Sequence, residues 1–507
     1  MTRLPPAQTP STSPRARSSV AGGRGKQSKQ HGAGAARARE RERLEAAAAG
    51  VALPARASVC VIGGGAAGLA AAITAAELGA QVVVLERALE CGRTILATGN
   101  GRCNFANVDL DPSNYNKPKL AARVMGEKDA ALGSILSFFS ASGLAWAEED
   151  GRLYPVSRQA ASVRNVLLAR AHAADVVLAG GREVASARRN ARGWRVNGAQ
   201  TWDGCPFELE ADAVVLASGG ATSDLARTLG LRIVDESPVL CGVAAQGPVP
   251  GMLERLSGRR AHALATLTRA GRVVHREAGE VLFRPYGISG IVSFNLSRHA
   301  RPGDQLELDL APTVDARTVD ELVARRPGQP GALDGILDPQ IASELIELAG
   351  GVHISGLAWR VAPLVKGLPL RVTGLADAEH AQVTRGGINV GQVDPNTLAC
   401  AGAPGLFACG ETLDVDGACG GYNLAWAWAS GMRAGTSAAR LAQETDERRS
   451  SDKTVRAAEA ERDARAKRAN TKRDASVTAV GTAATEHAST APAPHSPAKL
   501  ALEGKLS

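Results

Sequence analysis

The sequence predicts an α/β fold whose parallel sheet is interrupted by a mainly β insertion with a small helical part. Three observations support this prediction. A glycine-rich turn joins an apolar strand to a helix near residue 63, strands and helices alternate before residue 220 and again after residue 381, and short alternating strands replace them between residues 240 and 380. A glycine turn after the first strand of such a pattern is typical of Rossmann-like domains. We therefore expect one Rossmann-like domain built from two separate stretches of chain.

Each element follows from the spacing of apolar residues and from glycines at the boundaries. In the first stretch we expect strands at 58–62, 81–85 and 212–216 and helices at 69–78, 128–145 and 159–174. In the insertion we expect strands at 241–246, 264–268, 272–276, 280–283 and 305–309, followed by helices at 317–325 and 339–349. The last stretch adds a strand at 406–408 and a helix from residue 422 to about residue 439.

The formal net charge of +8 resides in the two tails. Residues 1–56 contain 11 Lys/Arg against 3 Asp/Glu and residues 441–507 contain 12 against 10, so residues 57–440 have a formal charge of −2. Nucleic-acid-binding surfaces are usually basic, and we therefore expect no nucleic acid on this core. Both tails contain few large apolar side chains, and we expect them to be disordered. The densely charged run at 451–474 is either a solvated helix or coil, or a segment that binds a partner. The first tail also has the composition of a transit peptide, but no amphipathic apolar face.

The spacing of the cysteines bears on the cellular compartment, and the spacing of the histidines bears on metal binding. The eight cysteines include no Cys-x-x-Cys pair, and the nine histidines have no metal-ligand spacing. We therefore expect a cytoplasmic protein without a metal site. No apolar stretch reaches the length of a membrane span without glycine and charge, so we expect no membrane association.

The first chemical motif is the glycine turn, which reads GGGAAG from residue 63 to residue 68. Gly63 permits the tight turn, Gly65 lets a pyrophosphate approach the backbone, and Gly68 lets the helix pack close to the sheet. Glu86 ends the next strand, 23 residues after Gly63, where a carboxylate can accept hydrogen bonds from an adenosine ribose. A carboxylate there disfavours a 2′-phosphate. The nucleotide is therefore FAD or NAD(H).

The choice between these nucleotides depends on later elements, because FAD is longer and needs contacts for its ribityl chain and ring. Gly410 and Glu411 follow the strand at 406–408, where a carboxylate can bind ribityl hydroxyls. Gly420 and Gly421 open the last helix, whose N–H groups and positive dipole end suit the pyrimidine edge of a reduced flavin. Taken alone, each of these two elements is as readily structural as functional.

Six segments of the chain form a series of distinctive motifs: GRTILATGNGRCNFAN, DGRLYPVS, ADAVVLASGG, GEVLFRPYGISG, AQVTRGGINVGQVDPNTL and GLFACGETLDVDGACGGYNLAWAWASGMRAG. Together they resemble successive motifs of one family, the BaiN-like bacterial flavoproteins, often labelled aminoacetone-oxidase-like or NAD(P)/FAD-dependent oxidoreductases. The resemblance runs from about residue 57 to residue 440. This chain departs from the family pattern at Thr94, where the family usually has Lys, at Asn100, where it tends to have Gly, and after Gly220, where a turn is shortened.

The resemblance implies bound FAD, with its diphosphate at residues 63–68 and 217–219, its ribityl chain at Glu411, and the loop at 99–104 beside the flavin. An FAD-binding domain would then comprise residues 57–239 and 381–440, and the insertion at 240–380, helical at about 314–362, would face the substrate. The expected cofactor-binding residues are Gly63, Gly65, Ala66, Ala67, Gly68, Glu86, Arg87, Arg93, Gly99, Asn100, Gly101, Arg102, Cys103, Asn104, Val184, Ala217, Ser218, Gly219, Gly410, Glu411, Gly421, Tyr422, Asn423 and Leu424.

Candidate acid–base groups are Tyr154, Asp414, Asp416 and Tyr422, because each belongs to a motif expected near the isoalloxazine ring or its approach. Cys103 is either a flavin neighbour or a packing thiol. No second Gly-x-Gly-x-x-Gly turn for a nicotinamide nucleotide is present.

The expected function is an FAD-dependent oxidoreductase. We expect it to be an NAD(P)H-linked reductase of a small organic substrate, such as an activated C=C bond, acting by hydride transfer through flavin N5. One alternative is an oxidase that passes electrons to oxygen. Another is a flavin-bearing RNA-associated protein that uses the basic N-terminal tail, although the acidic core counts against it.

Overall fold

The computed structural model describes residues 24–221, 223–326, 329 and 331–483. The chain divides into two units, Met1–Ala442 and Gln443–Ser507. The first contains the Rossmann-like domain and the insertion, and the described part of the second belongs to helix α13 (Tyr422–Ala483). No helix in the described ranges is both long and apolar enough to cross a membrane.

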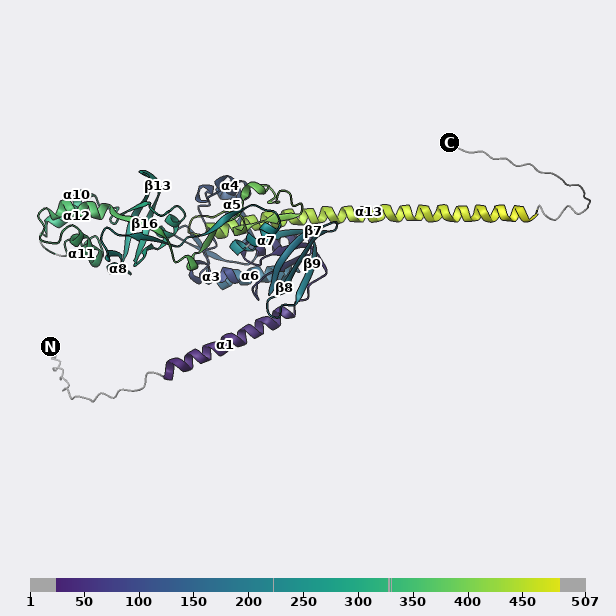
Figure 1. The fold of residues 1–507 in the computed structure, drawn as a ribbon, viewed down its shortest axis with the longest axis horizontal. Coiled ribbons are helices and arrows are strands. Elements are labelled where there is room, and N and C mark those ends of the chain that lie inside the picture. Colours follow the sequence, from purple (N-terminus) through teal and green to yellow (C-terminus); the bar gives the residue numbers. More distant parts are fainter. Residues whose placement is uncertain (1–23, 222, 327–328, 330, 484–507) are drawn as a thin grey trace, which may run out of the picture. The chain divides into compact units, whose positions relative to one another are not determined.

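A seven-stranded sheet forms the centre of the Rossmann-like domain (Figure 1). Its order is β6-β2-β1-β9-β8-β7, and β18 pairs with the carboxyl half of β9. The parallel strands are β6 (Val177–Ala179), β2 (Val82–Leu85), β1 (Arg56–Ile62), β9 (Pro206–Leu216) and β18 (Leu406–Ala408). An antiparallel hairpin of β7 (Arg182–Asn190) and β8 (Gly193–Gln200) completes the sheet. Because β18 joins β9, the two stretches of chain meet in one sheet, as the sequence predicts.

Helix α13 packs closely against α2 (Ala66–Glu77), the helix that follows the glycine turn. A Cβ added at Gly431 would lie 2.4 Å from the carbonyl oxygen of Ala67, and one at Gly435 would lie 2.3 Å from that of Ala71. Any side chain at these two glycines would separate the helices. The small residues of α13 therefore hold the C-terminal stretch against the start of the fold.

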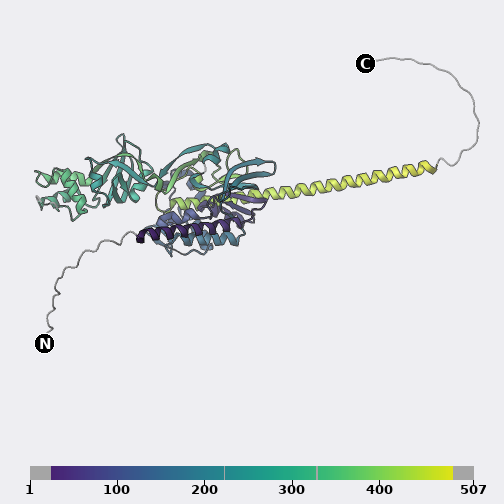
Figure 2. The same cartoon turned by 60° about the horizontal axis from the view of Figure 1, so that its bottom comes forward.

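The insertion is a closed six-stranded barrel with its own hydrophobic core. Its strands are β11 (Gly242–Gln246), β14 (Gly287–Ser289), β13 (Arg272–Arg284), β12 (Arg260–Arg269), β15 (Gln305–Asp309) and β16 (Leu368–Ala376). Helices α8 (Met252–Arg255), α9 (Ile291–Ser297), α10 (Ala316–Ala324), α11 (Pro339–Leu348) and α12 (Leu357–Lys366) accompany it. Figures 1 and 2 show α10, α11 and α12 at the end of the barrel away from the seven-stranded sheet.

Two small sheets complete the first unit. β10 (Ile233–Val239) and β17 (Val383–Ile388) pair antiparallel where the chain enters and leaves the insertion. β3 (Ala106–Asn107), β5 (Arg152–Pro155) and β4 (Trp146–Glu149) form a three-stranded sheet. The remaining helices are α1 (Arg24–Ala49), α3 (Arg93–Ala97), α4 (Pro118–Met125), α5 (Lys128–Ala141), α6 (Ala160–Ala173) and α7 (Ser223–Thr228).

The structure confirms the fold class and corrects some element predictions. The two strands expected at 272–276 and 280–283 are one strand, β13, and β16 and α12 were not predicted. Regular helix also replaces the expected disorder at α1, and the extension of α13 takes the helical one of the alternatives expected at 451–474. The reason is composition: α1 is rich in Ala, Arg and Glu, and ion pairs such as Arg41–Glu45 support it. The tail residues 1–23 and 484–507 lie outside the described residues.

Candidate functional site

The expected cofactor residues gather at the carboxyl edge of the parallel strands. The glycine turn follows β1, Glu86 follows β2, Ala217 follows β9 and Gly410 follows β18. Ligands of open α/β sheets bind at this edge, because loops from neighbouring strands converge there. The structure therefore brings together motifs separated by more than 300 residues of sequence.

The glycine turn packs closely against the backbone that follows β9. Gly63 has a φ of +104°, and a Cβ there would lie 2.5 Å from the carbonyl oxygen of Ala217. Gly65 is the N-cap of α2 and makes no side-chain capping bond. The N–H groups of the first turn thus remain available for an anion, as a diphosphate requires.

Glu86 lies beside this turn. Its Oε2 accepts a hydrogen bond from the N–H of Gly64 at 2.6 Å, and its Oε1 accepts one from Ala88 at 2.8 Å. These bonds fix the carboxylate, which has further lone pairs for a ribose. Arg87 is exposed, with its Nη1 3.9 Å from Glu183 in β7, next to Val184. Arg93 is also exposed, at the start of α3.

Gly410 and Glu411 form the second part of the edge. A Cβ at Gly410 would lie 2.6 Å from the Cβ of Ala67, so only glycine permits this approach to α2. Glu411 is largely buried, and desolvation raises the pKa of its carboxyl group. Its Oε1 accepts a hydrogen bond from the N–H of Thr384. Gly219 lies nearby, since a Cβ there would be 3.9 Å from Glu411 Oε2.

The start of α13 faces the loop at 99–104. Gly421 has a φ of +99°, and a Cβ there would lie 2.5 Å from the carbonyl oxygen of Ala106 and 2.9 Å from Asn104 Oδ1. Asn104 Oδ1 is buried without a hydrogen-bond partner among the described residues. A buried acceptor without a donor is costly unless a ligand supplies one. This atom therefore fits a bound ring with an N–H group, as the flavin pyrimidine has.

Other predicted residues near α13 have partners within the chain. Asn423 donates to the carbonyl of Gly417 at 3.0 Å and accepts from its N–H at 2.8 Å. Leu424 is half-buried beside it. In the 99–104 loop, Gly99, Asn100 and Gly101 all have positive φ angles. Cys103 is buried, and burial raises the pKa of its thiol to about 11, which is expected of a packing thiol.

Sequence comparison places this site in a known family. The family described as "HI0933-like protein Rossmann domain" matches residues 57–437. The chain belongs to the HI0933-like family. The 3-dehydro-bile acid delta(4,6)-reductase of Clostridium scindens is 34% identical over 414 aligned residues, which cover 75% of this chain and 98% of that protein.

Two further relatives are the ribosomal RNA dihydrouridine synthases of Escherichia coli and Haemophilus influenzae. They are 26% and 27% identical, over 74% and 73% of this chain and 96% and 95% of their own lengths. The family resemblance recognised in the sequence is confirmed, and this HI0933-like protein is an FAD-dependent oxidoreductase.

The predicted acid–base groups of the HI0933-like protein are mostly held by cations. Asp414 pairs with Lys117 Nζ at 2.7 Å. Tyr154 is buried, with Arg102 stacked 4.5 Å from its ring centre and Arg158 at 5.0 Å. Arg102 also pairs with Glu149 of β4 at 2.9 Å.

Asp416 and Tyr422 are the two remaining candidates. Asp416 is completely buried between Arg298 and Arg385. Burial opposes its ionisation, but hydrogen bonds and charge from both arginines outweigh burial and lower the pKa of the carboxyl group. Desolvation raises the pKa of Tyr422 to about 12. Asp416 is thus a fixed anion in a clamp between the insertion and the Rossmann-like domain.

The structure adds a group that the sequence analysis missed. Glu277 Oε1 accepts a hydrogen bond from Asn295 Nδ2 at 2.8 Å, and Glu277 Oε2 lies 3.1 Å from His275 Nε2. Asn295 Oδ1 in turn accepts from the N–H of Cys419 at 2.7 Å, directly before the start of α13. Burial is the main cause of the raised pKa values of Cys419 and Tyr422, and the charge of Glu277 makes a smaller contribution to both, which for Tyr422 is also smaller than those of Asp109 and Asp111. Titratable side chains of the barrel are therefore linked through Asn295 to the segment just before α13, which the sequence places at the pyrimidine edge of the flavin.

Proposed function

We propose that this HI0933-like protein is an NAD(P)H-linked reductase that saturates a carbon–carbon double bond activated by a neighbouring carbonyl. The observation that carries the proposal is the hydrogen-bonded group His275–Glu277–Asn295 against the loop before α13. Saturating such a bond needs a hydride and a proton from different groups. This arrangement holds proton-carrying side chains beside the site proposed for the flavin.

The names of the relatives support this reaction class. One is a bile-acid delta(4,6)-reductase, and two are dihydrouridine synthases. Dihydrouridine is uridine whose ring C=C bond, conjugated with a carbonyl, has been reduced. Both names therefore describe reduction at a carbon–carbon double bond. The higher identity to the bile-acid enzyme favours a small organic substrate for this chain.

Each part of the site has a proposed role. Residues 63–68 and 217–219 bind the diphosphate of FAD, Glu86 binds the adenosine ribose, and Glu411 binds the ribityl chain. Asn104 and the N–H groups at the start of α13 orient the pyrimidine edge. Bound FAD supplies hydride at N5. Glu277, held by His275 and Asn295, gives a proton to the carbon next to the carbonyl and regains it from solvent through His275.

Anaerobic stopped-flow spectroscopy tests this proposal. Holoenzyme mixed with NADH or NADPH is expected to lose its oxidised flavin absorbance. The reduced enzyme mixed with a steroid 4-en-3-one, as a probe of an activated C=C bond, is then expected to regain that absorbance without oxygen. Enzyme that neither nucleotide reduces, or that only oxygen reoxidises, would be the oxidase instead.

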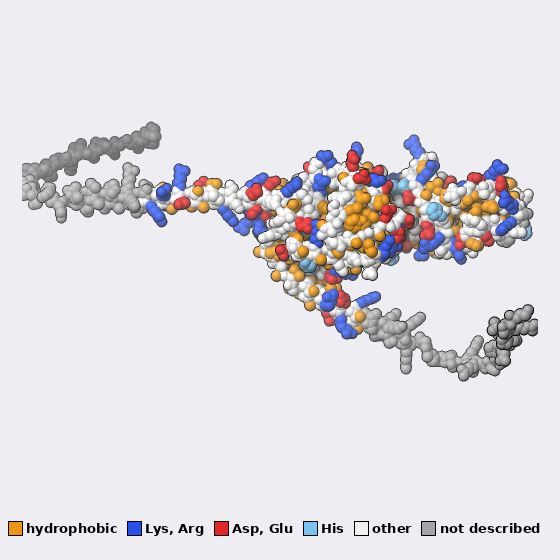
Figure 3. Space-filling model, turned by 180° about the vertical axis from the view of Figure 1, so that it is seen from behind, with side chains coloured by type: hydrophobic (Ala, Val, Ile, Leu, Met, Phe, Trp, Pro, Cys, Tyr) orange, Lys and Arg blue, Asp and Glu red, His pale blue; other side chains and the backbone are white. Residues whose placement is uncertain are grey.

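Ribosomal RNA is a second candidate substrate, favoured by the names of the two dihydrouridine synthases. The formal charge of −2 on residues 57–440 counts against it, and basic and acidic side chains are interspersed on the face shown in Figure 3. The basic residues 1–56 are the remaining contact for RNA. Deleting residues 1–39, which leaves the packed residues before β1 in place, should abolish RNA binding if RNA is the substrate, and should leave enone reduction unchanged if it is not.

A further inference from the structure

A pocket of about 410 Å³ lies where the barrel meets the β10–β17 sheet. β10, β17, the end of α9 and β16 line it, and so do the adjoining ends of β12 and β13. None of its lining residues belongs to the expected FAD site. Its volume is in the range of small-ligand pockets, which is roughly 300–1,000 Å³. This cavity is therefore a candidate second site.

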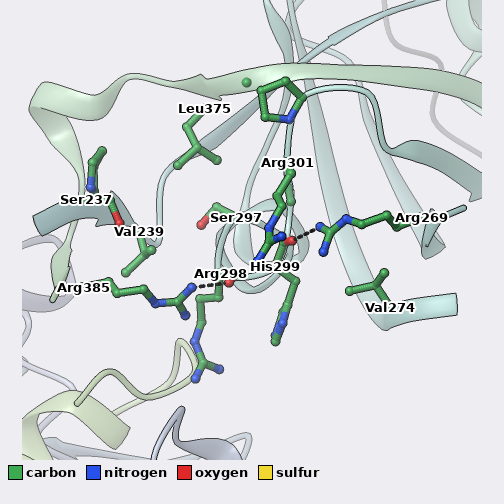
Figure 4. A pocket seen from close by; sticks show the side chains of 14 residues that line it. Ser237, Val239, Arg269, Val274, Ser297, Arg298, His299, Arg301, Leu375 and Arg385 are labelled. Carbon is green, nitrogen blue, oxygen red and sulfur yellow. Dashed lines mark hydrogen bonds between the residues drawn. The ribbon is translucent and has the colours of Figure 1, made fainter. Parts of the chain in front are cut away.

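The charged residues that line the pocket are all basic. Arg269, Arg298, Arg301 and Arg385 line the pocket, and no Asp or Glu does (Figure 4). Arg298 and Arg385 share the single carboxylate of Asp416, and Arg269 pairs with Asp304. The four arginines that line the pocket are thus balanced by only two carboxylates, those of Asp304 and Asp416. Both carboxylates are buried, and neither lines the pocket. Arg301 is exposed and forms no side-chain ion pair with any residue that the structure describes. Its backbone N–H donates to Asp304 at 2.8 Å, and its charge helps to lower the pKa of that carboxyl group.

Arg269, Arg298 and Arg385 are held in place before any ligand binds. Arg269 Nη2 donates to the carbonyl of His299 at 2.7 Å, and Arg385 Nη1 donates to that of Arg298 at 2.5 Å, as the dashed lines in Figure 4 show. Fixed guanidinium groups lose little entropy when they bind a planar or tetrahedral anion. Val239, Val274 and Leu375 supply an apolar wall beside them.

We propose that this pocket binds the phosphate or carboxylate group of a small organic anion, at a site separate from the flavin. An anion there would offset the excess positive charge and contact Arg298 of the insertion and Arg385 of the Rossmann-like domain together. The apolar wall would receive the carbon skeleton next to the anionic group. Neither the flavin nor the proposed reduction is needed for this binding.

Two variants and a control test the site by titration calorimetry on the holoprotein at constant ionic strength. Gly374 lines the pocket, has no positive φ, and a Cβ there meets nothing within 4 Å, so Gly374→Phe should fill the cavity without strain. Arg301→Gln removes the exposed charge. Arg317→Gln is the control, because Arg317 is an exposed arginine of α10 with an ordinary helical ion pair.

The probes are inorganic phosphate, uridine monophosphate, uridine and cholate. We expect the phosphate probes to bind wild type and Arg317→Gln alike, and Arg301→Gln and Gly374→Phe to weaken binding by about tenfold or more. Uridine should not bind. The same variant pattern with cholate alone would assign a carboxylate ligand. Failure of all three anions to bind wild type, or equal binding to Gly374→Phe, would overturn the proposal.

Discussion

The side-chain oxygen of Asn295 accepts a hydrogen bond from the backbone N–H of Cys419 at 2.7 Å, while its amide nitrogen donates to Glu277. One amide therefore joins α9, β13 and the loop that opens α13, because it has both a donor and an acceptor. The position of Glu277 relative to Gly420 and Gly421, which precede α13, depends on the side chain of Asn295.

The first prediction concerns Glu277. Glu277→Gln keeps an acceptor for Asn295 but removes the transferable proton, so we expect turnover of an enone to fall by roughly 100-fold or more. Flavin reduction by NAD(P)H should be unchanged, because the proton is needed only in the second half-reaction. Stopped-flow measurement of each half-reaction separates these effects. Glu379→Gln, at a mostly exposed carboxylate, is the control. Equal loss in both half-reactions would contradict the assigned role.

The second prediction concerns Gly421. Gly421→Ala should abolish FAD retention and lower stability by about 2 kcal/mol or more, because the added Cβ meets the carbonyl of Ala106 in a left-handed conformation. Gly402→Ala is the matched control, because Gly402 also has a positive φ but open space around its Cβ. Flavin released per mole of protein and urea unfolding measure the two effects. Similar losses in both variants would show that glycine is required only for its positive φ angle, and not for the close approach of residue 421 to Ala106.

The meeting of the glycine turn, Glu86 and Gly410–Glu411 at one edge of the sheet could be predicted, because each of these motifs is recognisable from a short stretch of sequence. The glycine turn, Glu86 at a strand end and the Gly-Glu after the strand at 406–408 are short motifs whose geometry follows from sequence spacing. Rossmann topology then brings their loops to one edge of the sheet.

The Glu277 group was not predictable in this way. Glu277 and His275 alternate on one strand like any exposed polar pair, and their partner Asn295 contacts Cys419 across 124 residues of sequence. Helix α12 was missed for a different reason, because Pro363 inside it is a helix breaker by local rules. Tertiary packing against the barrel outweighs that propensity, since Val361 and Val365 are fully buried.

The third prediction compares two asparagines, one whose side-chain oxygen has no hydrogen-bond donor among the described residues and one whose side chain is fully hydrogen-bonded. Asn104→Ala removes a buried acceptor that has no donor among the described residues, so the stability of apoprotein should change by less than about 1 kcal/mol while FAD affinity falls about tenfold. Asn423→Ala removes an amide whose donor and acceptor both bond to Gly417, so it should lower apoprotein stability by about 1–3 kcal/mol. Fluorescence titration with FAD and urea unfolding provide the two readouts. A large loss of apoprotein stability in Asn104→Ala would show that Asn104 is structural.

The last prediction concerns the pH dependence of the Asp416 clamp. Because the arginines lower the pKa of this carboxyl group in the folded protein, ionised Asp416 stabilises the fold above its ordinary pKa of about 4, and the stabilisation is lost as pH falls through the lowered value. Asp416→Asn leaves Arg298 and Arg385 without their shared anion and should cost about 3–5 kcal/mol at pH 7. Urea unfolding of both proteins between pH 7 and pH 3 should show this difference constant down to about pH 4 and shrinking below it. A difference that instead grew on acidification would mean that Asp416 is protonated in the folded protein, and the clamp would then be a neutral hydrogen-bonded contact.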